Sequence, residues 1–103
     1  MGFLSRLGWI VRGGILPNPY AFAMAYKSVL AGDKDLIAVG QALRELRLQR
    51  GFSQEVLAVD AGVERSYMGA IERAEVNVTL VVLSRICRAL RVRPSDLLEK
   101  AGM

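Results

Sequence analysis

Residues Gln54–Arg73, QEVLAVDAGVERSYMGAIER, decide the fold, because they predict two short helices joined at a glycine. The first half places Leu57, Ala58 and Ala61 at three- and four-residue spacing, so these side chains share one inward face of a helix. Gly62 marks the end of that helix, since a sharp turn favours a residue that can adopt a positive φ without a Cβ clash.

The second half of this stretch predicts a helix with two different faces. One face is apolar and is expected to pack inward, and the other is free to contact a partner. The apolar stripe consists of Val63, Tyr67, Met68 and Ile71, and the opposite face consists of Glu64, Arg65, Ser66, Gly69, Ala70 and Arg73.

The spacing of these two helices indicates a helix-turn-helix, whose close crossing requires a small residue such as Ala58. The motif resembles that of the phage Cro/repressor-type (XRE) family, and the resemblance runs from about Leu36 to Leu98. Its segment RSYMGAIERAEVNVTL is similar above all to the signature of the controller proteins of restriction-modification systems. The matching positions are Gln54, Leu57, Ala58, Ala61, Gly62, Val63, Met68 and Ile71.

This resemblance implies an all-α, five-helix, lambda-repressor-like DNA-binding domain over residues 35–103, preceded by an apolar arm over residues 1–34. Two positions depart from the family pattern. The family usually has serine where this chain has Gly69, and glycine where it has Ala74. We therefore expect the end of the second motif helix to be shaped differently from that of its relatives.

Short polar residues and a proline mark the starts of the predicted helices. Ser53 and Thr79 can each accept a hydrogen bond from an amide of the first turn that follows, and Asp35 is predicted to do the same for the first helix. Glu55 adds negative charge at the positive end of its helix. Pro94 suits the first turn of the last helix, because its fixed φ is helical and it lacks an N–H.

Three further amphipathic stretches complete the predicted core. Their apolar residues recur at three- and four-residue spacing, as in helices that pack one face against a core. Residues 74–78 are predicted to be a loop. The inward positions are Val39, Leu43 and Leu46 before Gly51, then Leu80, Leu83, Cys87 and Leu90, and finally Leu97 and Leu98.

Composition narrows the possible functions. The 103 residues suffice for one small domain, and 52% of them are hydrophobic. A net charge of +4 and eleven arginines among fourteen basic residues fit a nucleic-acid or anionic partner. The lone Cys87 indicates a reduced, cytoplasmic protein. With no histidine there is no expected metal site, and no cofactor motif or catalytic constellation is present, so we do not expect an enzyme.

The start of the second motif helix is the predicted reading element for double-stranded DNA. A helix fits the major groove, where each base pair presents a distinct pattern, and arginine can bond guanine at two acceptors. The predicted base-reading residues are Arg65, Ser66, Tyr67, Glu64 and Ala70. Ala70 could touch only a thymine methyl group. Tyr67 is expected to pack in the core with its hydroxyl at the groove or at a phosphate. For Glu64, helix capping is an open alternative.

Phosphate contacts are expected from Gln54, Arg73, Asn77 and Arg44. The resemblance implies that Gln54 meets a phosphate while it braces the second motif helix, and that the loop near Arg73 and Asn77 makes further contacts. Two alternatives stay open, since Asn77 could be a loop cap and Arg44 could lie on a solvated face.

The resemblance also implies an ion pair between Arg47 and Glu72 that holds the first helix to the second motif helix. A domain this small makes few DNA contacts, so we expect a homodimer on a partly palindromic operator. Val81, Val82, Leu97 and Leu98 are candidates for the dimer surface, with core packing as the alternative.

The apolar arm, residues 1–34, is less regular. Pro17 and Pro19 are expected to divide it, and Ala21–Leu30 is a candidate helix. The uncharged run Gly13–Tyr26 is too short to span a membrane, which takes about 20 apolar residues. Met24 offers an internal start that leaves a chain of the family's usual size.

Three roles for the arm stay open: packing on the domain or on a partner protein, lying on a membrane surface, or an extension of little consequence. Two alternative functions follow from them. One is an antitoxin-like protein-interaction module, and the other is a peripheral membrane adaptor that uses Phe3–Leu16.

Overall fold

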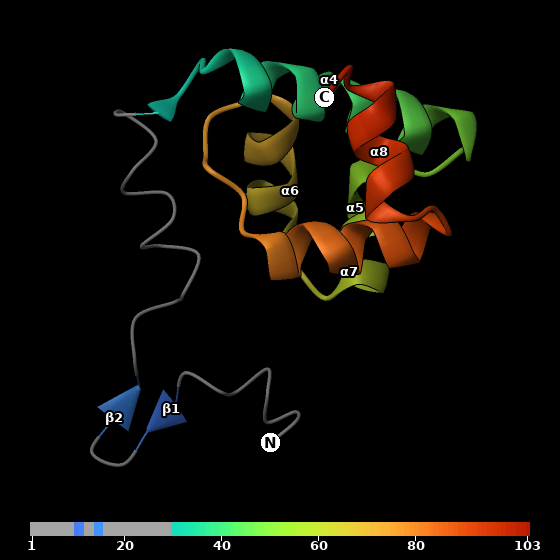
Figure 1. Ribbon diagram of the computed structural model, residues 1–103. Helices are drawn as coiled ribbons and strands as arrows, with labels where there is room; N and C mark the ends of the chain where they lie inside the picture. Colours follow the sequence, from blue (N-terminus) through green and yellow to red (C-terminus); the bar gives the residue numbers. More distant parts are fainter. Residues whose placement is uncertain (1–9, 12–13, 16–29) are drawn as a thin grey trace.

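The computed structural model describes residues 10–11, 14–15 and 30–103, and its helices confirm the predicted all-α class (Figure 1). Five helices lie within the described residues: α4 (Lys34–Gln49), α5 (Gln54–Ala61), α6 (Arg65–Glu72), α7 (Leu80–Leu90) and α8 (Pro94–Lys100).

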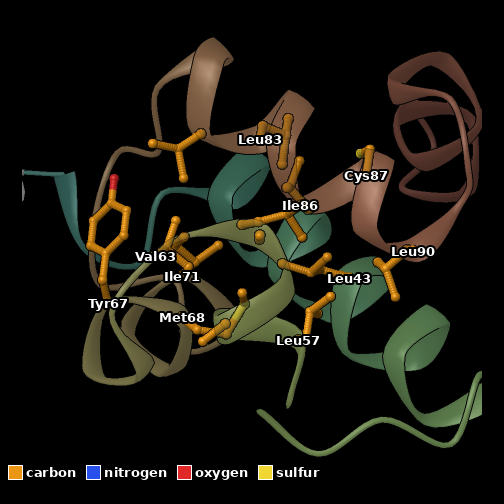
Figure 2. Close-up of a cluster of buried hydrophobic side chains, with 14 of the residues drawn as sticks. Leu43, Leu57, Val63, Tyr67, Met68, Ile71, Leu83, Ile86, Cys87 and Leu90 are labelled. Atoms are coloured by element: carbon orange, nitrogen blue, oxygen red, sulfur yellow. The ribbon is translucent and has the colours of Figure 1, made fainter. Parts of the chain in front are cut away.

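The helices enclose one hydrophobic core. Helix α4 packs against α6 and α8, α5 packs against α6 and α7, and α7 also packs against α8 (Figure 1). Figure 2 shows side chains from α4 to α7 converging in this core. The largest fully buried ones are Tyr67, Leu43, Leu57, Met68, Ile86, Leu90, Leu97, Val76 and Cys87.

Two of the predicted helix starts have the expected side-chain cap, and one does not. The hydroxyl of Ser53 accepts a hydrogen bond from the Val56 amide at 3.1 Å, and that of Thr79 accepts one from the Val82 amide at 3.2 Å. The prediction of Asp35 as the cap of α4 was wrong. Asp33 is the capping residue, and Asp35 already belongs to the first turn, where its amide donates to Asp33 at 2.8 Å.

The C-terminal ends of α5 and α6 share one backbone motif. After α5, Gly62 has φ +73° and the Val63 amide donates to the Ala58 carbonyl at 2.9 Å. After α6, Ala74 has φ +59° and the Glu75 amide donates to the Ala70 carbonyl at 2.9 Å. Both are Schellman ends. Ala74 thus ends α6 in the left-handed conformation that glycine favours, although its Cβ makes this conformation cost about 1–2 kcal/mol.

The core differs from the prediction at α7 and in the loop before it. Leu80 was predicted to face inward, yet it is 71% exposed, whereas Val82 is buried. Helical spacing gives the direction of a side chain, but Leu80 is the first residue of α7 and lies at the edge of the core. Val76, in the segment predicted to be a loop, is fully buried among the core residues.

Within the arm, the structure describes a short hairpin that we did not predict. Strand β1 (Ile10–Val11) pairs antiparallel with β2 (Gly14–Ile15), with Ile10 opposite Ile15. The remaining expectations for the arm lie outside the described residues. They are the helix at Ala21–Leu30 apart from Leu30, the breaks at Pro17 and Pro19, the start at Met24 and the role of Phe3–Leu16. Among the described helices, none is long and apolar enough to cross a membrane.

Candidate nucleic-acid interface

The first turn of α6 presents polar side chains to solvent. Arg65 and Ser66 are the first two residues of this helix, and both are exposed. Glu64 is the N-cap residue, with an extended backbone, and its side chain makes no capping hydrogen bond. The helix start therefore places two side chains capable of donating hydrogen bonds at the surface.

The exposed face of α6 is narrower than the sequence predicted. The stripe of Val63, Tyr67, Met68 and Ile71 is buried as expected, but Gly69 and Ala70 are buried too. Elements on both sides cover α6, because α4 and α5 each pack against it.

Two of the predicted base contacts are therefore wrong. Ala70 has no exposed surface and cannot reach a thymine methyl group. Tyr67 is 1% exposed and its hydroxyl oxygen is buried, so the predicted placement of this hydroxyl at the groove is also wrong. Figure 2 shows the Tyr67 ring at one side of the core cluster.

A buried ion pair joins α4 to the end of α6, between the two residues that the resemblance implied. Nε of Arg47 donates to Oε2 of Glu72 at 2.7 Å, and Nη2 donates to Oε1 at 3.0 Å. The amide nitrogen of Gln54 donates to the same Oε1 at 3.0 Å. The first residue of α5 is thus connected through Glu72 to Arg47.

Arg73, directly after α6, forms a second ion pair. Its Nε donates to Oε2 of Glu75 at 3.1 Å, and its Nη2 donates to Oε1 at 3.2 Å. The hydrogen bonds that Arg73 donates to Glu75 raise the pKa of Arg73 above its ordinary value. Glu75 was not singled out from the sequence, although opposite charges two residues apart around a helix end are a usable signal.

The other two predicted phosphate contacts are exposed. Asn77 lies in the loop between α6 and α7, and Arg44 lies on the solvent side of α4. Gln54 is half-buried at the start of α5. Within the part of the chain that the structure describes, no cluster of three metal-ligating side chains occurs.

The predicted dimer surface is only partly exposed. Val82 and Leu97 are buried in the core, which agrees with core packing, the alternative left open for them. Val81 is 64% exposed and stands next to the exposed Leu80, while Leu98 is half-buried against the core. The apolar surface on this side is therefore centred on the first turn of α7.

Comparisons with known proteins agree with this geometry. A family model described as a helix-turn-helix domain matches residues 38–101. The control protein C.BamHI of Bacillus amyloliquefaciens is 43% identical over 61 residues, which cover 58% of this chain and 75% of that protein.

Solved structures of controller proteins are also similar. That of C.AhdI from Aeromonas hydrophila has 48% sequence identity and a TM-score of 0.60, covering 61% of this chain and 96% of that one. A tetramer of C.Esp1396I in complex with its natural 35 base-pair operator has 29% identity and a TM-score of 0.59, covering 67% of this chain and 96% of that one.

Proposed function

The chain belongs to the helix-turn-helix family of DNA-binding transcriptional regulators that includes the restriction-modification controller proteins, and we propose that it binds a partly palindromic operator as a homodimer. It acts as a controller-type regulator of its own operon. It does so without catalysis or a cofactor, in the cytoplasm and on the nucleoid.

The observation that carries this proposal is the first turn of α6. Arg65 and Ser66 are exposed there, while the rest of the helix is held against the core by buried side chains. A helix held in this way can enter the major groove by its N-terminal end without rearrangement. Arg65 reads a guanine and Ser66 reads a neighbouring base edge. Glu64, the N-cap residue beside them, accepts a hydrogen bond from a cytosine amine.

Phosphate contacts flank the reading residues. Gln54 is fixed at the start of α5 by its hydrogen bond to Glu72, and Arg73 is exposed at the other end of α6. Asn77 and Arg44 supply further contacts from the loop and from α4. Such contacts position the protein on the duplex without reading its sequence.

A homodimer doubles these contacts and sets two half-sites about one helical turn apart. The dimer surface includes Val81 and Leu80, which are exposed on α7, and Leu98, which is half-buried on α8. The C.Esp1396I assembly on its operator supports oligomeric binding in a similar protein.

The test is selection from a random duplex library by the purified chain, followed by a salt titration on the enriched sequence. We expect a palindrome bound far more tightly than random DNA, with affinity falling about a thousandfold or more between 50 and 200 mM salt if six to ten phosphates are contacted. Absence of enrichment would overturn the proposal. A variant with Val81→Asp should remain folded and lose cooperative binding to the two half-sites.

A further inference from the structure

The two basic residues of the DNA-facing segment are not equally available. Between Gln54 and Asn77, Arg65 and Arg73 are the only basic residues, whereas five residues are acidic. The side chain of Arg73 is 59% exposed, yet two of its guanidinium nitrogens already donate to the carboxylate of Glu75, at 3.1 and 3.2 Å. Half of the positive charge in this segment is therefore paired within the chain.

The backbone that follows α6 brings the pair together. Ala74 adopts φ +59°, which reverses the chain so that the Glu75 amide donates to the Ala70 carbonyl at 2.9 Å. The Ala74 amide donates to the Ile71 carbonyl at 3.0 Å. These two hydrogen bonds fix the backbone of Glu75 beside the end of the helix. The Glu75 carboxylate is therefore held within hydrogen-bonding distance of Arg73.

Gly69 provides the space in which the guanidinium lies. A Cβ at this position would come 2.9 Å from Nη1 of Arg73 and 3.5 Å from the amide oxygen of Gln54. Arg73 is thus folded back along α6 toward Gln54, the residue that we place on a phosphate. A larger residue at position 69 would displace the guanidinium from this site.

We propose that Glu75 competes with DNA phosphate for Arg73 and thereby lowers the affinity of the protein for DNA of every sequence. A guanidinium grips a phosphate through a pair of donors, and the carboxylate of Glu75 occupies such a pair, Nε and Nη2. When Arg73 contacts DNA, its guanidinium therefore exchanges the carboxylate of Glu75 for a DNA phosphate. Glu75 is a positioning residue in this account, and the inference rests on the proposed function.

The competition weakens binding to specific and nonspecific DNA alike. Arg73 faces the backbone rather than the bases, so the exchange reduces binding to the operator and to random DNA by the same factor. The affinity of the free chain for DNA is thereby held low without a change in which base pairs it prefers.

The test is the neutral, nearly isosteric variant Glu75→Gln in the full chain, with affinity measured on the selected operator and on random DNA. We expect binding to both to tighten by about two- to fivefold, the range of an exposed ion pair. The slope of log affinity against log salt should steepen by up to about 0.9, because Arg73 would hold its phosphate without competition from Glu75.

Two controls separate the competition from net charge. Asp96→Asn removes the same charge from a similar fork, in which Nη2 of Arg93 donates to Asp96 at 3.2 Å, but on α8. This variant should bind DNA as the wild type does. In an Arg73→Ala background, Glu75→Gln should give no gain beyond that of Asp96→Asn.

Three outcomes would overturn the inference: unchanged or weaker binding by Glu75→Gln, an equal gain from Asp96→Asn, or a gain that persists without Arg73. Each of these is compatible with a wild-type chain that selects an operator. A wild-type chain that selects none would instead overturn the proposed function, so the two failures are distinguishable.

Discussion

Arg47 and Glu72 tie α4 to the last residue of α6 across 25 positions of the sequence. Both side chains are buried, and their two hydrogen bonds are 2.7 and 3.0 Å long. The third nitrogen of the guanidinium donates to the Phe52 carbonyl at 2.9 Å, which closes the junction before α5. One side chain thus connects the first helix to both helices of the motif.

Replacement of Arg47 by alanine should lower the free energy of unfolding by about 3–5 kcal/mol, because Glu72 would remain buried without its partner. Urea denaturation measures this change. Lys100→Ala is the control, since Lys100 pairs with the exposed Glu45 at 3.2 Å, and its loss should cost less than about 1 kcal/mol. If both variants lost a similar amount of unfolding free energy, the buried ion pair would contribute no more to stability than the exposed one.

Arg65→Ala should relax discrimination at one base pair of each half-site by about 1–3 kcal/mol, because a bidentate guanine contact is lost. Arg73→Ala should instead weaken binding to operator and random DNA by the same factor. Competition assays with single-base operator variants separate the two effects. Arg88→Ala, an exposed site on α7, serves as the control. If both α6 variants weakened specific and random binding equally, the assigned roles would be wrong.

Gly40→Ala should lower the free energy of unfolding by about 1–3 kcal/mol. A Cβ at Gly40 would lie 2.7 Å from the Glu72 carbonyl oxygen and 2.8 Å from that of Ile71. These are backbone atoms, so a side-chain rotation cannot relieve the contact. Thermal unfolding should show Gln41→Ala, at the neighbouring exposed position of α4, within about 0.5 kcal/mol of the wild type. Equal stability of both variants would show that α4 and α6 can separate at little cost.

Arg91→Gly should raise the free energy of unfolding by about 0.5–1 kcal/mol, because Arg91 adopts φ +61° at the end of α7 and glycine does so without a Cβ clash. Arg88→Gly removes the same charge from the last turn of α7, where the backbone is helical, and should lower the free energy of unfolding by up to about 1 kcal/mol. Chemical denaturation of both variants makes the comparison. A loss of stability in both would mean that the conformation of Arg91 carries no strain.

Burial, with a smaller effect from the charge of Asp96, raises the pKa of Cys87 from 9.0 to about 11. A raised pKa in the folded state means that the neutral thiol stabilises the fold below pH 9, and that this contribution is lost as the pH rises toward 11. Urea unfolding from pH 8 to pH 11 should show the wild type losing roughly 1 kcal/mol per pH unit more than Cys87→Ala. If the unfolding free energies of the wild type and Cys87→Ala changed with pH in parallel, the raised pKa of Cys87 would be contradicted.

Several features could be predicted from the sequence because their causes are local. The cap at Ser53, the left-handed turn at Gly62 and the proline start of α8 each depend on residues within one helical turn. The stripe of α6 was correct for the same reason, because helical geometry alone places residues three and four apart on one face.

The width of a buried face could not be predicted in this way. Ala70 and the hydroxyl of Tyr67 were assigned to DNA, yet both are buried, and α4 and α5 both pack against α6. Leu80 shows the opposite error, since its spacing pointed inward but it lies beyond the edge of the core. Periodicity gives a direction around one helix, whereas burial depends on which other elements lie there.

The sequence by itself determined where α5 begins and ends and that the segment Gln54–Arg73 is a helix-turn-helix. Only the tertiary structure decided that α4 crosses α6 at Gly40, that Val76 belongs to the core and that Arg73 rests over Gly69. The reason is distance along the chain. Caps and turns are set by neighbouring residues, while crossings and buried faces depend on contacts between segments that pattern alone cannot place in space.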